Sequence, residues 1–317
     1  MKRLRYGGIL ALLGFLVACG GGPAAPPQIV AAYPADGARG VRKNEAIVVT
    51  FDRSMDRSAT EAAFSLWDPD GKPLSVQFAW EDGDRRMRVT PSQPWRYSDT
   101  DQPVYYRYRL STGAKSAGGA PLAQAFEARF ATLRKLEWKK TSSPALDGAV
   151  SDLGFVNNDP SGATAYILAY VGDFASNRAL RAFFVFELGD FPPEAVELDQ
   201  ARLRVWLKAK YGSPEADLGS LSLARVDLGA GLDKDDYQAP ALGNPLEISP
   251  GWVVGAWREL DVSPLFAAAW GEDADRLDLR FAFEVGSDWD SAADRLDLAT
   301  GEYATYAPEL VVRYYAP

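Results

Sequence analysis

Cationic and aromatic side chains alternate with apolar ones in residues 201–210. If this run is a β-strand, its side chains point alternately to two faces. One face then carries Arg202, Arg204, Trp206, Lys208 and Lys210. An indole ring can stack on the apolar face of a sugar, and an arginine fork can pair with a carboxylate or a sulfate. The spacing therefore predicts a glycan-binding face with Trp206, Arg202, Arg204 and Lys208 as contact residues. The alternative is a solvated strand whose cations pair with surface acids while Trp206 packs under a loop.

The chain of 317 residues contains no histidine and one cysteine. These counts exclude a Ser-His-Asp triad, a Cys-His pair, a His-ligated metal and a disulfide within the chain. The sequence also contains no nucleophile elbow, phosphate-binding P-loop or dinucleotide fingerprint. A carboxylate pair for glycoside hydrolysis leaves no recognisable spacing, so a polysaccharide-cleaving enzyme stays open as an alternative. We expect a non-catalytic protein with no catalytic residues.

Acidic residues gather in two predicted loops. One loop carries Asp233, Asp235 and Asp236, and the other carries Asp288 and Asp290 with Asp294 nearby. Carboxylate oxygens are preferred ligands of Ca²⁺, so either loop could hold a structural calcium ion. Neither spacing fits an EF-hand, and solvated acidic turns are the alternative. No other cofactor is expected.

The amino terminus has the pattern of an export signal. Lys2, Arg3 and Arg5 precede the uncharged residues 7–18, a stretch too short to span a bilayer as a helix. Residues 16–19, Leu-Val-Ala-Cys, resemble the lipobox of bacterial lipoprotein signal peptides. The resemblance implies removal of residues 1–18 and attachment of acyl chains such as palmitate to Cys19, the only cysteine. Two or three acyl chains give stable membrane anchoring. The alternative is an ordinary secretory signal with an incidental cysteine.

The segment after Cys19 and the net charge describe the expected mature chain. Residues 19–27 are rich in Gly and Pro and predict a tether. Removing residues 1–18 takes away three of the 34 basic residues and none of the 43 acids, so the net charge becomes about −12. Such an acidic protein repels phosphate backbones, which argues against nucleic acid as a partner.

Residues 28–134 predict a small β-sandwich. Strand-like alternation occurs at 47–51, 87–89 and 106–110, with Gly- and Asp-containing turns between the runs. Met55 and Asp56 are expected in a turn after a core strand rather than as ligands. The order of landmarks resembles a bacterial Ig-like domain of the S-layer-protein type. The residues that carry this resemblance are 33–41, 47–56, 89–91, 106–108, 118–122 and 130–132. The resemblance implies a spacer or adhesion module.

Residues 135–317 predict a second, larger β-sandwich, with a linker near residues 136–144. Strand-like apolar runs occur at 165–171, 182–188, 201–209, 221–226, 277–285 and 310–314. The run at 182–188 is apolar on both faces, which predicts a central strand covered on both sides. Only residues 264–270 predict a helix, with Ser263 as N-cap.

The second half also resembles a known family. Residues 177–188, 191–193, 201–205, 257–263 and 307–314 are similar to DNRLRE-type domains. The chain departs from the family pattern at Glu187, where Asp is usual, and at Gly301 and Glu302. The resemblance implies a jelly-roll-like sandwich related to carbohydrate-binding modules of polysaccharide-handling surface proteins.

Together these observations predict an all-β protein of the cell envelope, anchored through an N-terminal lipid and facing the periplasm or the exterior. Its Ig-like domain would present a carbohydrate-binding-like sandwich to a polysaccharide. The alternative is a scaffolding lipoprotein whose second sandwich docks another envelope protein. An exposed aromatic and cationic face would favour the first role, and a hydrophobic outer face would favour the second.

Overall fold

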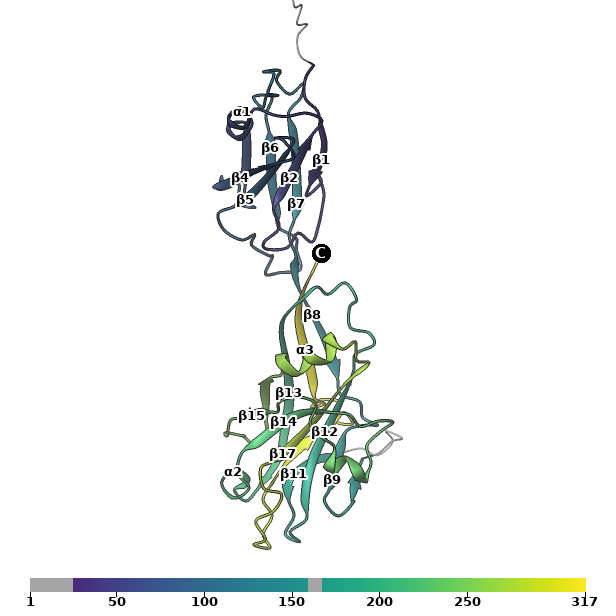
Figure 1. Ribbon diagram of the computed structural model, residues 1–317. Coiled ribbons are helices and arrows are strands. Elements are labelled where there is room, and N and C mark those ends of the chain that lie inside the picture. The colour runs from purple at the N-terminus through teal and green to yellow at the C-terminus, as the bar shows by residue number, and fades with distance from the viewer. Residues whose placement is uncertain (1–24, 159–166) are drawn as a thin grey trace, which may run out of the picture. The chain divides into compact units, whose positions relative to one another are not determined.

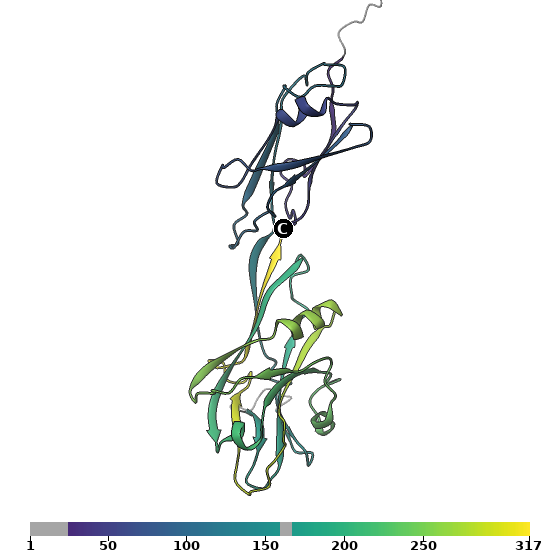
Figure 2. The same ribbon diagram turned by 60° about the vertical axis from the view of Figure 1, so that its left-hand side comes forward.

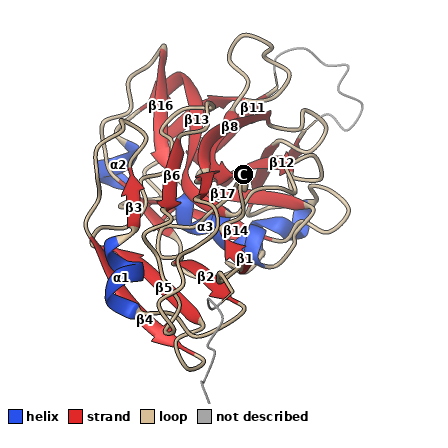
Figure 3. Ribbon diagram, turned by 90° about the horizontal axis from the view of Figure 1, so that it is seen from above, coloured by secondary structure: helices blue, strands red, loops and turns tan. Residues whose placement is uncertain are grey.

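The computed structural model describes residues 25–158 and 167–317, so Cys19 lies outside the described residues. The chain divides into two compact units, one running to Trp95 and including Tyr105–Ala131, the other comprising Arg96–Val104 and Thr132–Pro317. Residues 96–104 therefore group with the second unit, although the sequence analysis placed them in the domain 28–134. Strands dominate both units and helices are short (Figure 3), which confirms the predicted all-β class.

The first unit consists of two antiparallel sheets (Figure 1). One sheet has the order β1 (Ile29–Tyr33), β2 (Ile47–Phe51), β5 (Arg86–Pro91) and β4 (Val76–Glu81), and the other has the order β3 (Phe64–Trp67), β6 (Tyr105–Leu110) and β7 (Phe126–Ala131). Alternate residues of β2 are buried, as the pattern Ile47, Val49, Phe51 predicts. These side chains join Tyr108 and Phe130 in one core.

Met55 and Asp56 have structural roles in the described residues. Met55 is buried in the core of the first unit. Asp56 is the N-cap of α1 (Arg57–Ala62), where its Oδ1 accepts a hydrogen bond of 3.0 Å from the N–H of Ala59. An N-cap carboxylate satisfies a backbone donor that the helix leaves free. The turn expected after β2 is therefore the start of a short helix.

The second unit is one hydrogen-bonded network of twelve strands that curls over a single main core (Figure 2). Nine strands follow one path in the order β15, β14, β17, β12, β11, β18, β13, β19, β8, and β9, β10 and β16 branch from it. The strands are β8 (Arg134–Thr141), β9 (Gly148–Ser151), β10 (Val156–Asn157), β11 (Leu168–Asp173), β12 (Ala179–Glu187), β13 (Glu197–Tyr211), β14 (Leu221–Val226), β15 (Leu246–Ile248), β16 (Ala256–Asp261), β17 (Arg276–Phe283), β18 (Arg295–Ala299) and β19 (Glu309–Ala316). The short helices are α2 (Pro214–Asp217), η1 (Lys234–Gln238) and α3 (Ser263–Gly271).

Strand β12 is covered on both faces, as its unbroken apolar run predicts. Phe184 and Phe186 point into the main core, where the ring of Phe184 packs edge-on against Phe281 with centroids 5.9 Å apart. Phe183 and Val185 point the other way, into a second cluster that includes Tyr237 of η1. The strand therefore contributes to two apolar layers.

The predicted linker at 136–144 is wrong for most of its length. Residues 134–141 form β8, which pairs antiparallel with β19 from Arg134 opposite Ala316 to Thr141 opposite Glu309. Strand β8 ends the main path of the sheet. Charged residues such as Lys139 and Lys140 are typical of edge strands, because they oppose pairing with another chain. The same charges make an edge strand resemble a linker in the sequence.

Helix α3 is confirmed, but its predicted N-cap is not. The N-cap is Val262, and Ser263 is the first helical residue, without a side-chain cap. Instead, the N–H of Ala201 donates to the Ser263 hydroxyl at 2.9 Å. The serine thus joins the helix to β13.

A buried carboxyl group connects three segments of the second unit. Asp147 is fully buried and accepts hydrogen bonds from the hydroxyl of Ser142 at 2.5 Å and the N–H groups of Val185 at 3.0 Å and Gly301 at 2.9 Å. Burial, with a smaller effect from the charge of Glu302, outweighs these hydrogen bonds and raises the pKa of Asp147 to about 8. The carboxyl group therefore retains a proton in the folded state over a pH range in which the unfolded chain has lost it.

We predict that Phe184→Ala lowers the free energy of unfolding of the second unit by about 3–5 kcal/mol, because the truncation leaves a cavity in a closed core. Leu153→Ala is the control, since Leu153 is 74% exposed, and should change stability by less than about 0.5 kcal/mol. Urea unfolding followed by circular dichroism measures both. A loss below about 1 kcal/mol for Phe184→Ala would contradict the assignment of this ring to the core.

We predict that Asp147 makes stability fall as pH rises from about 4 to about 8. Because its folded-state pKa of about 8 lies above the usual 3.8, the stabilisation is complete below the lower value and is lost as pH rises through the higher one. Asp147→Asn should lack this component, so the stability difference between the two proteins should change across the range. Asp190→Asn, at an exposed ion pair, should retain it. Parallel urea-stability profiles for Asp147→Asn and the unaltered protein would refute this role.

Candidate functional site

Strand β13 places the predicted cationic and aromatic face on the outside of the second unit. Its 15 residues pair with β19 through Glu197–Arg204, with β16 through Arg202–Leu207 and with β18 through Leu207–Tyr211. The inward side chains Ala201, Leu203, Val205 and Leu207 are fully buried. Their burial fixes the register, since a shift of one residue would turn this apolar row outward. Arg202, Arg204 and Trp206 consequently face away from the core.

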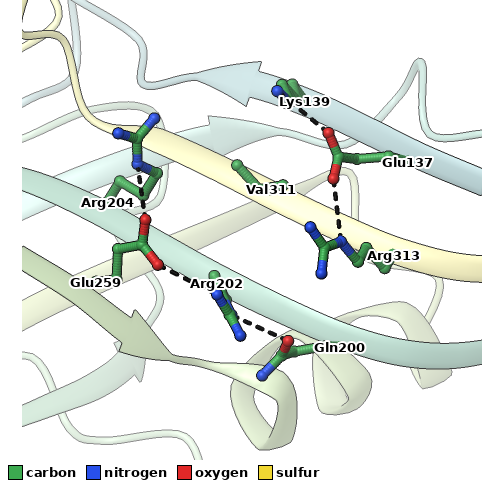
Figure 4. Close-up of a pocket in the computed structure, with 8 residues that line it drawn as sticks. All are labelled: Glu137, Lys139, Gln200, Arg202, Arg204, Glu259, Val311 and Arg313. Carbon is green, nitrogen blue, oxygen red and sulfur yellow. Dashed lines mark hydrogen bonds and ion pairs between the residues drawn. The ribbon is translucent and has the colours of Figure 1, made fainter.

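A small hollow of about 190 Å³ opens on this face (Figure 4). Strands β8, β13, β16 and β19 contribute its lining, which is Glu137, Lys139, Gln200, Arg202, Arg204, Glu259, Val311 and Arg313. Four of these side chains are cationic and two are carboxylates. Two of the predicted contact residues, Arg202 and Arg204, therefore meet cations from other strands that the sequence did not connect with them.

Carboxylates from neighbouring strands pair with both arginines of β13. Glu259 of β16 lies 3.2 Å from Arg202 Nη1 and 3.3 Å from Arg204 Nε, measured to its Oε2 and Oε1. Glu309 of β19 lies 2.6 Å from Arg204 Nη1. The partners in each pair are about a third to a half exposed. Such exposed pairs contribute at most about 1 kcal/mol each, so an incoming anionic or hydroxylated ligand can compete with them.

A second ion-pair group forms the opposite wall of the hollow. Glu137 of β8 pairs with Arg313 of β19 at 3.0 Å and with Lys139 at 3.1 Å. Burial alone would raise the pKa of Glu137, but the hydrogen bonds from Arg313 and Lys139 hold it below its usual value. This carboxyl group remains ionised at neutral pH and orients the two cations beside it.

Trp206 lies in an aromatic cluster rather than in the lining of the hollow. Its ring stacks on Tyr306 with centroids 4.3 Å apart and meets Trp257 of β16 edge-on at 5.5 Å. The guanidinium of Arg204 lies 4.7 Å above the ring of Trp257, so this residue joins the cluster to the hollow. Trp206 is half-buried. Sequence reasoning missed Tyr306, because it lies in a loop far along the chain and no spacing relates it to β13.

The two lysines that follow Trp206 differ. Lys208 is exposed and forms no ion pair with the described residues. Lys210 Nζ lies 2.6 Å from Glu215 of α2. The structure thus brings Arg202 and Arg204 together in one hollow, places Trp206 beside it, and leaves Lys208 outside its lining.

The two acidic loops differ in arrangement. In the first, Asp233 and Asp236 form a capping box at the start of η1, with the Asp233 N–H donating to Asp236 Oδ2 at 2.6 Å. In the second, ligand-type oxygens of Asp288, Asp290 and Asp294 lie within 4.8 Å of one another. Among the described residues, only this second group brings three carboxylates close enough to share an ion.

A wider hollow of about 530 Å³ lies elsewhere on the second unit. Its lining includes five carboxylates, Glu187, Asp227, Glu272, Asp275 and Asp278. Arg225 pairs with Glu272, and Arg276 Nη2 lies 2.8 Å from Asp278 Oδ2. None of its lining residues in the described part of the chain is aromatic, so these residues offer a sugar no stacking surface.

No helix in the described ranges is long and apolar enough to cross a membrane.

Several solved structures are similar to this chain, but only at a low level. PcoC, a methionine-rich copper resistance protein from Escherichia coli, is 18% identical over 34% of this chain and 99% of its own, with a TM-score of 0.27. CopC from Methylosinus trichosporium OB3b is 13% identical over 34% of this chain and 94% of its own, with a TM-score of 0.26. The N-terminal part of the bacterial S-layer protein SbsC is 12% identical over 51% of this chain and 41% of its own, with a TM-score of 0.27. Such values carry no conclusion on function.

The family comparison concerns the first unit. No curated protein matches the chain. Residues 23–132 match the bacterial Ig-like domain family, in agreement with the two sheets and the single core of the first unit. The match ends before the second unit, for which the DNRLRE resemblance stays a prediction. Residues 23–132 are therefore a bacterial Ig-like domain, as the order of landmarks in the sequence predicts.

Proposed function

We propose that this protein is a non-catalytic glycan-binding protein of the bacterial cell envelope, anchored through a lipid on Cys19. The Ig-like domain carries the second unit, whose β13 face binds an acidic polysaccharide. The observation that carries the proposal is the meeting of Lys139, Arg202, Arg204 and Arg313 around one hollow in a chain of net charge −9.

The charge arrangement suits repeated carboxylate or sulfate groups. Two carboxylates and four cations line the hollow, so the lining has an excess of positive charge. Arginine forks bind planar oxyanions through two parallel hydrogen bonds. Glu259 holds Arg202 and Arg204 beside each other before any ligand arrives. This preorganisation reduces the entropy lost when the ligand binds.

The hollow is too small to enclose a sugar chain, so a chain would lie across it. Its volume of about 190 Å³ is below the roughly 300–1,000 Å³ of pockets that enclose a drug-sized ligand. The cluster of Trp206, Trp257 and Tyr306 lies beside it on the same face. Aromatic surface next to cations offers one sugar unit a stacking contact while the next unit pairs its acid group.

The scaffolding alternative has weaker support. Large exposed apolar side chains occur as pairs in loops, such as Leu153 with Phe155 and Val253 with Val254. Protein docking sites of stable complexes need a contiguous patch of about 800 Å² on each partner. Within the described residues these pairs are too small for such a patch.

We predict that the soluble chain from residue 20 to 317 binds acidic polysaccharides in a salt-sensitive manner. Arg202→Gln and Trp206→Ala should each weaken binding about tenfold, equivalent to about 1.4 kcal/mol. Isothermal titration calorimetry against alginate, pectate, a sulfated glycan and neutral dextran measures this, with folding checked by circular dichroism.

The matched control is Arg88→Gln in the first unit. Arg88 also lies on a strand, pairs with a glutamate, Glu81, and is 41% exposed against 43% for Arg202. Its substitution should leave affinity unchanged. Binding that survives both Arg202→Gln and Trp206→Ala would move the site off this face, and failure of the folded protein to bind any of these glycans would reject the proposed function.

A further inference from the structure

Three carboxylates of the segment between β17 and β18 converge, and no ion pair joins them to a basic residue in the described ranges. The facing oxygens of Asp288, Asp290 and Asp294 lie within 4.8 Å of one another. Two oxygens that each lie about 2.3–2.6 Å from one Ca²⁺ ion are separated by at most about 5 Å. The spacing of these oxygens therefore matches a shared calcium ion.

Backbone hydrogen bonds hold each of the three carboxylates in place. Asp288 Oδ1 accepts from the N–H of Asp290 at 3.2 Å, and Asp290 Oδ1 accepts from the N–H of Ala292 at 2.6 Å. Asp294 Oδ1 accepts from the N–H of Ser213 at 2.6 Å. One oxygen of each group is thus used to orient it.

A buried carboxylate behind the cluster supplies an independent indication of a cation. Asp173 of β11 is fully buried, and its Oδ1 accepts from the N–H of Asp294 at 2.9 Å. Its Oδ2 is also buried and accepts no hydrogen bond of normal geometry from the described residues, although the Ser287 side chain lies beside this carboxyl group. An unpartnered buried carboxylate oxygen is costly. Since the other oxygen of the same carboxyl group contacts the backbone of Asp294, this buried charge lies directly behind the cluster, where a nearby cation would offset its cost.

Asp217 of α2 adds a further carboxylate beside the cluster. Its side chain lies next to that of Asp294. Like charges at such distances destabilise one another unless a cation or a proton lies between them. Acidic residues from one loop, one helix and one strand thus lie near one another.

We propose that Asp288, Asp290 and Asp294 bind a Ca²⁺ ion, with Asp173 behind the cluster and Asp217 beside Asp294. Ca²⁺ takes six to eight oxygen ligands in flexible geometry, so water and backbone carbonyls complete the shell. Mg²⁺ demands a tighter octahedron and binds more weakly at such a site. This proposal does not depend on glycan binding by the β13 face.

The ion would order the loop that exposes Trp289. Trp289 is 73% exposed, and its φ of 66° and that of Ser291, 65°, lie in the left-handed region. Non-glycine residues are strained in this region, because Cβ comes too close to the following carbonyl oxygen. Ligation of Asp288 and Asp290, on either side of Trp289, would compensate for this strain.

The test measures Ca²⁺ binding to the chelator-treated chain of residues 20–317. One Ca²⁺ per chain should bind in isothermal titration calorimetry, and Ca²⁺ at about 100 times its Kd should raise the melting temperature of the second unit by about 5–10 °C. Asp290→Asn keeps the hydrogen bond to Ala292 and should lose at least tenfold in Ca²⁺ affinity. Asp235→Asn, in the capped acidic loop, should bind as the unaltered protein does.

Terbium luminescence gives a second readout that does not rest on the acidic variants. Tb³⁺ at the site should be sensitised by the adjacent indole, and Trp289→Phe should remove most of the signal while Ca²⁺ binding is retained. Ca²⁺ that neither binds nor stabilises the unaltered chain overturns the proposal. Equal Ca²⁺ affinity in Asp290→Asn and Asp235→Asn also overturns it.

Discussion

The alternation along β13 is the constraint on which the second unit depends. Its inward side chains form the centre of the main core, while its outward side chains form the cationic and aromatic face. Both faces follow from one register, and a slip of one residue would bury Arg202 and Arg204 and expose Leu203. Burying those guanidinium groups without partners would cost several kcal/mol each. The core therefore selects the register, and the face follows from it.

Ion pairs between strands hold the side chains of this face in place, and a ligand can still bind to them. Three acids, Glu137, Glu259 and Glu309, come from strands that flank β13 or β19 and hold the guanidinium groups in fixed positions. Because these pairs are partly exposed, they contribute little net stability. Their main effect is on geometry: they prevent the long side chains from searching many rotamers. A ligand acid that replaces one glutamate would meet arginines already aligned.

The sequence predicts what depends on local pattern and fails where distant segments meet. Alternation predicts the inward row of β13 and the two-sided burial of β12, because both follow from period-two geometry. Arg204 pairs with Glu309, and Trp206 stacks on Tyr306. Each contact joins residues about a hundred positions apart, so no local spacing in the sequence predicts it. The residues of β8 predict a linker because a strand at the edge of a sheet carries charged side chains. Those charges interrupt the apolar alternation by which a strand is recognised in a sequence.

The two acidic loops are alike in composition but differ in the contacts that hold their carboxylates. In residues 233–236 the acids accept hydrogen bonds from the start of η1, so local helix geometry accounts for them. In the second loop, Asp294 is anchored by Ser213 and backed by Asp173 of another strand. Carboxylates drawn together from three segments gain no helix cap and repel one another. A fold that keeps them together needs a compensating charge, and a cation ligated by all of them provides it.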